Sequence, residues 1–338
     1  MRLLDKENVA RPLPESLKAG DEPLFSHEYH REIPAVDLVE VKNAEVLPNG
    51  FVHVGGRLLP QVFLGPPKGL RALKAWLRMR QYHVCARAVR VERALFVTDD
   101  WSNGFFHWVG EVLPRLEVLG STEAEGRTLL VPAMADFEYA HQSLAAYRLP
   151  DIRFLAWSER VSCRDLLVVP PVAPTGNYRP AVMSALRDRM RRFFGARPAS
   201  RRLYISRAGA AARRIANESD VLPLLERHGF ERVLAERLSL SEQVRLVGSA
   251  SILIGTTERD SRMRAGCFRA RTSSSCAGRG IVPTTATTLL QALWGSGTTT
   301  SRARQPMSAR PPTTRISWWT LSGWRPSLQA WPTDELRD

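Results

Sequence analysis

The sequence predicts an α/β protein with two units, each a largely parallel sheet covered by helices. The first observation is that short apolar runs alternate with amphipathic segments from Ala94 onward. The second is a compact stretch from Arg201 to Gly255 in which three strand patterns are separated by two helix patterns. The third is the length of 338 residues, which is enough for two domains that each bury a core.

The stretch from Arg201 to Gly255 carries the strongest local signals. Asn217 is the expected N-cap of its first helix, and Gly229 is placed where a left-handed residue ends that helix. Ser239 and Glu242 have the spacing of a capping box for the second helix. The predicted strands are Leu203–Ile205, Phe230–Ala235 and Ser251–Gly255.

An arginine-rich loop follows the first of these strands. Arg207, Arg213 and Arg214 lie between the strand and the helix that begins near Asn217, at a carboxyl end, where ligands bind in open parallel sheets. Guanidinium groups and the free N–H groups of a helix N-terminus together could hold a diphosphate without a metal. The alternative is a solvated surface, which is the more frequent meaning of arginines in a strongly basic chain.

The earlier half has a second candidate site. A strand predicted at Ala94–Thr98 runs through a polar loop into a helix over Val109–Gly120. His107 and Glu111 are four residues apart, so they share one helix face near its N-terminus. They could contact a sugar hydroxyl or act as a base, with Glu111 the first candidate and His107 the second. The alternative is an ordinary surface pair.

The flanking segments predict the remaining organisation. We expect an arm, β-meander and helix over 1–92, a first domain over 93–196, a second over 197–255, and an aberrant tail over 256–338. The pattern of Leu70–Arg80 predicts a basic amphipathic surface helix of the fold, with Leu73 and Leu77 inward. The alternative is a helix that binds a membrane surface or calmodulin. Further strands are predicted at 128–131, 152–155 and 166–169, with helices over 137–147 and 181–194.

Composition restricts the cellular context. The net charge of +14 suits nucleic acid, anionic membranes or phosphorylated substrates, without choosing among them. Four cysteines without CxxC spacing indicate neither a zinc site nor a disulfide framework, so a reducing cytoplasm is expected. We expect no signal peptide and no membrane-spanning segment, since no run approaches about 20 apolar residues.

Two sequence blocks carry a family pattern. The first is Trp101-Ser-Asn-Gly-Phe-Phe-His-Trp108 with the following Glu111-Val-Leu-Pro-Arg-Leu116. The second is Tyr204-Ile-Ser-Arg207 with the arginines and Asn217-Glu218 beyond it, then Gly229-Phe230 and Glu242-Gln243. Together and in this order, the two blocks resemble glycosyltransferase family 61. Asn103-Gly104 stand in reversed order relative to the usual Gly-Asn of the family, which weakens any role for Asn103.

The resemblance implies a GT-B-like arrangement of two Rossmann-type domains and transfer of a sugar from a nucleotide sugar to a glycan or lipid-linked glycan acceptor. By position, Arg207, Arg213, Arg214, Asn217 and Glu218 would face the donor diphosphate, and His107 and Glu111 the acceptor or the transferred sugar. Bacterial members act in capsular or lipopolysaccharide assembly, which implies a cytoplasmic protein, at the inner face of the membrane if peripherally associated. No cofactor is expected, and no metal, because the domain has no Asp-x-Asp.

The pattern breaks after Gly255. The family pattern there is His-Gly-Ala-Gly-Leu-x-Asn, whereas this chain reads Thr256-Thr-Glu-Arg-Asp-Ser-Arg-Met263, and no Asp or Glu occurs from Ser261 to Thr333. Codons for Thr256–Met263, read two nucleotides later, are compatible with His-Gly-Ala-Gly-Leu-Ala-Asn. We therefore interpret residues 256–338 as an out-of-frame, disordered tail that leaves the second domain incomplete and this chain weakly active or inactive.

Two other functions stay open at this point. A basic, tryptophan-bearing tail could bind nucleic acid by stacking and arginine contacts, although its residues form no organised stripe and we expect no nucleic acid as partner. The chain could also be a non-catalytic relic of a transferase that folds only in its first domain.

Overall fold

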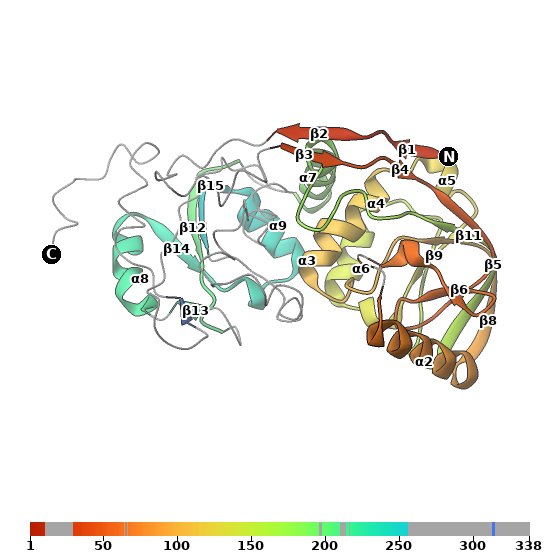
Figure 1. The fold of residues 1–338 in the computed structure, drawn as a ribbon. Helices are drawn as coiled ribbons and strands as arrows, with labels where there is room; N and C mark the ends of the chain where they lie inside the picture. The colour runs from red at the N-terminus through yellow and green to blue at the C-terminus, as the bar shows by residue number, and fades with distance from the viewer. Residues whose placement is uncertain are drawn as a thin grey trace. The chain divides into compact units, whose positions relative to one another are not determined.

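The computed structural model describes residues 1–10, 30–63, 65, 67–195, 198–209, 214–215, 217–255 and 313–314 (Figure 1). The chain divides into two compact units. Unit 1 comprises residues 1–7 and 32–190, and unit 2 comprises residues 8–31 and 191–338. The class is mixed α/β, as the alternating sequence pattern predicts.

The described part of unit 1 contains a seven-stranded mixed sheet of order β10-β9-β8-β11-β5-β6-β7. Four neighbouring strands, from β10 to β11, are parallel, and β5, β6 and β7 add an antiparallel edge. The strands are β5 (Val39–Val46), β6 (Val52–Val54), β7 (Arg57–Leu58), β8 (Arg87–Phe96), β9 (Thr128–Val131), β10 (Asp151–Phe154) and β11 (Glu159–Val168). The predicted meander therefore continues the main sheet.

Two central strands begin well before their predicted starts. β8 begins at Arg87 and β11 at Glu159, whereas the sequence indicated only their apolar ends. The added residues mix charged and apolar side chains, and the two strands pair in register along their length. The prediction relied on continuous apolar runs, which mark strands that are buried on both faces. It therefore found only the carboxyl ends of β8 and β11, where the residues are fully buried.

The amino-terminal segment, for which we expect an irregular arm or an edge element, forms short paired strands in its described residues. Its strands are β1 (Arg2–Leu4), β2 (Glu7–Ala10), β3 (His30–Ile33) and β4 (Val36–Asp37). β1 pairs with β4, and β2 pairs with β3. The buried Arg179 supports this segment by donating hydrogen bonds to the carbonyl oxygens of Asp5 and Pro34, at 2.9 and 2.6 Å.

Helix α2 (Leu70–Cys85) lies along the lower edge of unit 1 in Figure 1. The predicted inward orientation of Leu73 and Leu77 is wrong, because these side chains are 51% and 53% exposed. Ala75 and Met79 are the buried residues instead. The helix face that carries Ala75 and Met79 is therefore the inward one, and the face that carries Leu73 and Leu77 is exposed.

The remaining helices of unit 1 follow the parallel strands. They are α3 (Phe105–His107), α4 (Leu113–Glu117), α5 (Ser121–Ala124), α6 (Glu138–Leu144) and α7 (Pro180–Phe194), with a π-helical turn η3 (Trp108–Val112) and short 3-10 turns η2 (Pro60–Val62) and η4 (Ala133–Ala135). α7 continues into unit 2. Apolar side chains of the central strands and the meander form one buried core, which includes Val46, Val52, Phe96, Leu130 and Leu166.

Unit 2 confirms the pattern predicted between Arg201 and Gly255. Its described sheet has the parallel order β14-β12-β15, built from β12 (Arg201–Ile205), β14 (Phe230–Val233) and β15 (Ala250–Gly255). Helices α8 (Glu218–Arg227) and α9 (Leu240–Gly248) alternate with these strands, and η5 (Ala235–Arg237) precedes α9. Tyr204, Val221, Leu225 and Phe230 form its buried core.

The predicted helix ends are only partly correct. Ser239 and Glu242 form the expected capping box, and Gly229 adopts the left-handed conformation with φ +73°. Asn217 precedes α8 as predicted, but its side chain makes no capping hydrogen bond, because its backbone (φ −111°, ψ 38°) is not in the extended region typical of an N-cap.

The interpretation of the tail lies outside the described residues, apart from two. These are Thr313 and Thr314, which form β16 and pair in parallel with β13 (Arg214–Ile215). The family-type glycine-rich turn expected after Gly255 and its proposed out-of-frame replacement fall on residues that the structure does not describe.

The burial of Cys163 predicts selective thiol chemistry. Burial raises the pKa of the Cys163 thiol to about 12, with the charge of Glu45 adding to the effect, whereas Cys85 is exposed. Since the thiolate is the reactive form, iodoacetamide at pH 8 should modify Cys85 and leave Cys163 unmodified. Peptide mass mapping of native and urea-unfolded protein measures both sites. Equal modification of the two thiols in the native protein would contradict the described packing of β11.

Candidate active site

The candidate site of unit 1 is built where β8 ends. β8 is parallel to β9 and β11, so their carboxyl ends meet at one edge of the sheet, which is the usual ligand edge of α/β folds. From Phe96 the chain passes through a loop over residues 97–104 into α3 and η3. The segment that carries His107 and Glu111 thus starts at this edge.

Asp99 organises the loop. Its Oδ1 accepts hydrogen bonds from the backbone N–H of Trp101 at 2.9 Å and from the Ser102 hydroxyl at 3.1 Å. Its own backbone N–H donates to Ser102 Oγ at 2.9 Å. Asp99 and Ser102 are both fully buried. These bonds fix the path of the backbone before the helix begins.

Arg115 connects this loop to the helix. Its guanidinium donates a hydrogen bond through Nη2 to Asp99 Oδ2, and Nη1 donates to the carbonyl oxygen of Val97 at 2.9 Å. Arg115 and Asp99 are completely buried, so the pair is a charge-assisted contact removed from solvent. Breaking such a pair would leave one uncompensated buried charge.

His107 and Glu111 form a second buried pair. Glu111 Oε2 lies 2.9 Å from His107 Nδ1, and the two residues are 4% and 2% exposed, respectively. The alternative interpretation as a surface pair is therefore wrong. Among the described residues, Glu111 Oε1 has no hydrogen-bond partner. One carboxylate oxygen thus orients the imidazole, and the other is available to a ligand or a water molecule.

The backbone between these residues is a π-helical turn. α3, η3 and α4 form one continuous helical segment, in which Trp108–Val112 takes the wider winding. Single π-turns within α-helices are rare and occur frequently at functional sites. Here the turn carries Glu111 and all five of its residues are buried.

Aromatic side chains surround the pair. The Trp101 and His107 rings have their centroids 5.4 Å apart, and Trp108 Nε1 donates a 2.9 Å hydrogen bond to Ser143 Oγ. Gly104 lies beside the imidazole, since a Cβ at this position would be 3.4 Å from His107 Cδ2. The neighbouring Asn103 contributes its carbonyl oxygen, which accepts a hydrogen bond from Tyr139 at 3.2 Å.

The arginines predicted for the donor belong to unit 2. Arg207 follows the carboxyl end of β12 and is half-buried. Arg214 is exposed on β13, and Arg213 lies outside the described residues. The loop approaches η5 closely, since a Cβ on Gly209 would be 2.5 Å from Glu236 Oε1.

Glu218 is held by contacts within unit 2. It accepts a hydrogen bond from the Tyr204 hydroxyl at 2.7 Å and one from Arg232 at 3.3 Å. These contacts tie the N-terminus of α8 to β12 and β14. Asn217 immediately precedes that N-terminus and is partly buried. The two residues therefore lie at the start of α8, with Glu218 already paired, and their role toward a diphosphate stays a prediction.

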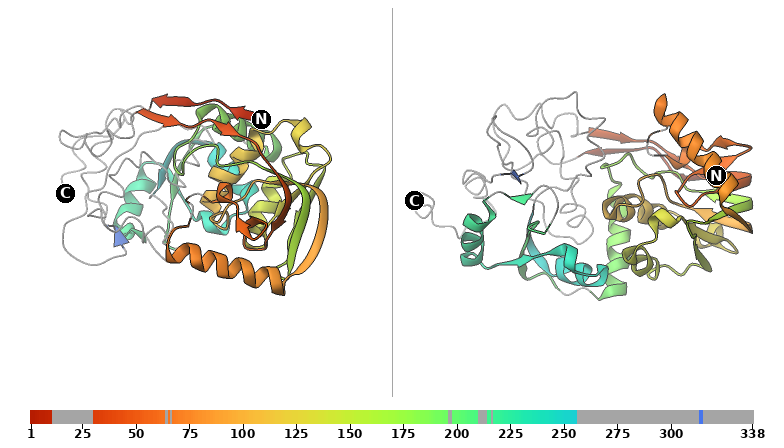
Figure 2. Two further views of the ribbon diagram at one scale, coloured as in Figure 1. Left: turned by 45° about the vertical axis from the view of Figure 1, so that its right-hand side comes forward. Right: turned by 90° about the horizontal axis from the view of Figure 1, so that it is seen from below.

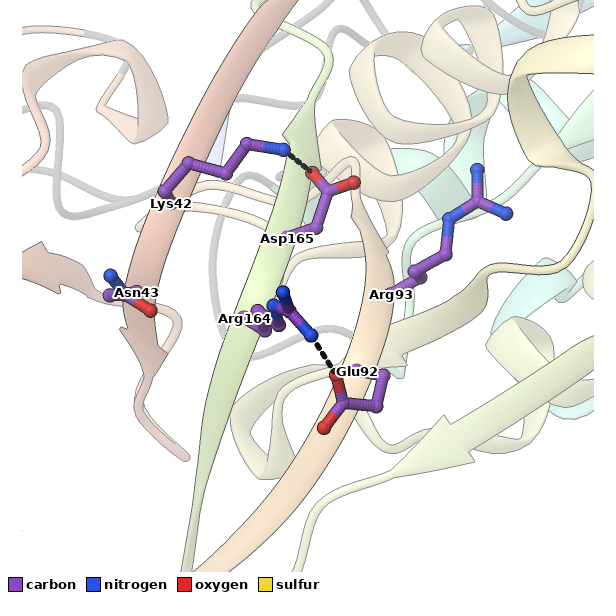
Figure 3. Close-up of a pocket in the computed structure, with 6 residues that line it drawn as sticks. All are labelled: Lys42, Asn43, Glu92, Arg93, Arg164 and Asp165. Carbon is purple, nitrogen blue, oxygen red and sulfur yellow. Dashed lines mark ion pairs between the residues drawn. The ribbon is translucent and has the colours of Figure 1, made fainter.

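A separate charged pocket lies on the sheet of unit 1 (Figure 3). Lys42 contacts Asp165 at 3.3 Å, and Arg164 contacts Glu92 at 3.7 Å. Partial burial raises the pKa of Asp165, but Arg127 and Lys42 lower it by more, so the carboxylate is held ionised. Because its carboxylates are already paired with cations, we do not assign this pocket to catalysis.

The region that carries both candidate sites is similar to a known protein family. Residues 105–258 match the family model described as Glycosyltransferase 61. The match supports the family resemblance, and it includes both the His107–Glu111 segment and the Arg207 loop. No curated protein matches the chain. The match thus indicates a glycosyltransferase with a sugar donor and an acceptor, without specifying either.

The sequence missed the residues that support the site. Asp99 and Arg115 are separated by sixteen positions, so no helical or strand spacing links them, although both lie in or beside the quoted motif. The sequence also did not bring together Glu45, His53 and His83, whose side-chain ligand atoms all lie within 4.8 Å of one another. Only the fold places these residues in contact.

The buried Asp99–Arg115 pair predicts a large stability effect. Arg115→Met should lower the free energy of unfolding of unit 1 by about 3–5 kcal/mol, because Asp99 would stay buried without its countercharge. Protease cleavage of unit 1 across a urea series measures the change. The matched control is Arg87→Met, since Arg87 pairs with Glu159 at 2.8 Å but has a largely exposed side chain. It should cost about 1 kcal/mol or less, and equal effects of the two substitutions would contradict the assigned role.

Proposed function

We propose that the protein is a glycosyltransferase that moves a sugar from a nucleotide sugar to a glycan or lipid-linked glycan acceptor in cell-surface polysaccharide synthesis. The observation that carries the proposal is the buried His107–Glu111 pair in a π-helical turn within the family-matched region. Buried, paired titratable groups at the ligand edge of a sheet are typical of catalytic sites.

The pair acts as one unit in this proposal. Glu111 Oε2 accepts the Nδ1–H of His107, which selects the tautomer whose Nε2 can accept a proton. His107 would remove the proton of the acceptor hydroxyl, and Glu111 would stabilise the resulting imidazolium. The sequence ranked Glu111 first as the base, whereas the hydrogen bond favours the imidazole in direct contact with the acceptor. Since both side chains are buried, the acceptor must displace the residues that cover them.

The donor side of the proposal is electrostatic. Transfer leaves a nucleoside diphosphate, whose charge Arg207, Arg213 and Arg214 would neutralise together with N–H groups at the start of α8. The half-buried position of Arg207 after β12 supports this role. Asn217 and Glu218 would line the same end of α8. The proposal needs neither a cofactor nor a metal.

The GT-B-like architecture with two Rossmann-type domains is part of the proposal. The alternation of parallel strands and helices in unit 2 supports it. Unit 2 would then be incomplete after about residue 255, where the proposed change of reading frame begins. The family match ends at residue 258, which supports this boundary.

The proposed location is the cytoplasmic face of the membrane, and α2 supports it. Leu70, Leu73, Leu77 and Val84 form an outward apolar stripe, with exposed side chains. Lys74 and Arg78 flank the stripe, and α2 contains no acidic residue. Helices of this type lie in the interface of anionic membranes. No described helix is long and apolar enough to cross a bilayer.

A transfer assay tests the proposed chemistry. It compares this chain with a frame-restored chain, whose codons after position 255 are read two nucleotides later. The restored chain should transfer from one member of a nucleotide-sugar panel, and this chain should show little or no turnover. In the restored chain, His107→Gln and Glu111→Gln should lower kcat by about 10²–10⁴-fold. Arg207→Ala should weaken donor binding by about 10–100-fold, as expected for a lost charge-assisted contact.

The control for that assay is His141→Gln. His141 also pairs with a carboxylate, Asp136, at 2.6 Å, but the pair is half-exposed. This variant should retain full activity. Unchanged turnover in the His107 and Glu111 variants would refute the assigned base. Tight donor binding by this chain itself would show that the altered tail does not impair unit 2, and steeply salt-dependent binding of DNA or RNA without donor binding would favour the nucleic-acid alternative.

A vesicle assay tests the role of α2. The protein should sediment with phosphatidylglycerol-containing vesicles and not with phosphatidylcholine vesicles, and high salt should weaken the binding. Leu73→Glu with Leu77→Glu should reduce binding by about tenfold or more, because the apolar stripe would no longer enter the interface. Phe193→Glu is the control, since Phe193 is equally exposed and lies on α7. Equal loss in both variants would argue against a specific role for α2.

A further inference from the structure

A cluster of two histidines and a glutamate lies between α2 and the antiparallel edge of the unit 1 sheet. Glu45 on β5 and His53 on β6 are directly paired across the two strands, so their side chains emerge on the same face. His83 comes from the last turn of α2. Figure 2 shows α2 at the periphery of unit 1 in both views. These three residues lie outside the predicted transfer site.

The three side chains converge on one carboxylate oxygen. Glu45 Oε2 lies 2.7 Å from His83 Nδ1 and 3.0 Å from His53 Nε2. The two imidazole centroids are 5.5 Å apart in an edge-on arrangement. One ligand atom from each residue lies within 4.8 Å of the others. Tetrahedral Zn²⁺, with bonds of about 2.0–2.2 Å, separates its ligand atoms by about 3.3 Å. The two Glu45–imidazole distances would therefore lengthen by a few tenths of an ångström when the ion enters.

His53 gives a second, independent indication of a ligand. It is 5% exposed, and within the described residues neither of its ring nitrogens makes a hydrogen bond of acceptable geometry, despite the 3.0 Å approach of Glu45. A buried polar group without a partner is costly.

Arg160 prepares the carboxylate for this role. Its guanidinium donates a hydrogen bond to Glu45 Oε1, the oxygen that does not face the histidines. Such outer contacts orient ligating carboxylates in metal sites. The same positive charge reduces the attraction for a cation, so the site should bind less tightly than an unopposed ligand set.

We propose that Glu45, His53 and His83 bind one divalent transition-metal ion of the Zn²⁺ class. Two imidazoles and one carboxylate match the ligand preference of zinc and leave a fourth position for water. The side chain of His83 is 43% exposed, which gives the ion a route from solvent. A bound ion would join the end of α2 to β5 and β6, where the buried helix residues otherwise are only Ala75 and Met79.

The test is metal binding by the full chain. Zn²⁺ titration calorimetry should show one equivalent bound, and Co²⁺ should give the visible absorption bands of a tetrahedral nitrogen and oxygen site. His83→Ala and Glu45→Gln should weaken Zn²⁺ binding by at least about tenfold. His83→Ala is the decisive variant, because a half-exposed side chain can be removed without unfolding the protein, whereas the buried His53 is less suited to substitution.

Two variants control for other ligands. Cys85→Ser removes the exposed thiol two positions beyond His83, and His141→Ala removes the other described histidine–carboxylate contact made by an exposed histidine on a helix. Both should retain the bound equivalent. Unchanged binding in His83→Ala, loss of binding in Cys85→Ser, or no stoichiometric uptake by the unaltered chain would each overturn the proposal. In the last case the cluster would be a carboxylate bridge between two imidazoles.

Discussion

The buried ion pair between Asp99 and Arg115 is the constraint on which the arrangement of unit 1 depends. It fixes the loop after β8 to the helical segment that contains α3, η3 and α4. Transferring two charges from water into a protein interior costs several kcal/mol per ion, so the pair is stable only because each charge has a close partner. Asp99 also holds Trp101 and Ser102. One carboxylate therefore fixes the loop at both ends.

This constraint explains why His107 and Glu111 can be buried together. The bonds of Arg115 to Val97 and Asp99 fix the rotation of the helical segment about its axis. Trp108 adds a third fixed point through its bond to Ser143. The imidazole and carboxylate are consequently held in one geometry, as the proton transfer proposed for them requires.

The sequence predicted the parallel elements well because their signals are local. Burial on both faces marks β9, β12 and β15, and Ser239 and Glu242 cap α9 through neighbouring backbone groups. The sequence-based prediction failed where contacts between distant residues determine the orientation of a side chain. The leucines of α2 were assigned inward because apolar periodicity does not reveal which face meets the sheet, and Ala75 and Met79 pack there instead. Whether Asn217 caps α8 likewise depends on the path of the preceding loop, which the sequence does not reveal.

Local sequence signals also identified part of the candidate site. His107 and Glu111 could be paired from their spacing, and Arg207 from its position after a strand. Asp99 with Arg115, and Glu45 with His53 and His83, needed the sheet register and helix docking before they could be recognised. Contacts between residues far apart in the sequence leave no periodic trace, however strongly they determine the fold.

The π-helical turn from Trp108 to Val112 has a consequence for how this segment can vary. Its wider winding accommodates one residue more than an α-helix of the same rise. Because the wide turn absorbs that residue, removing one between His107 and Glu111 would restore regular winding and leave the flanking helical segments nearly unrotated. The separation of His107 and Glu111 would then fall from four positions to three, and their side chains would meet in a different geometry. The segment should accordingly tolerate changes in residue type more readily than any change in length.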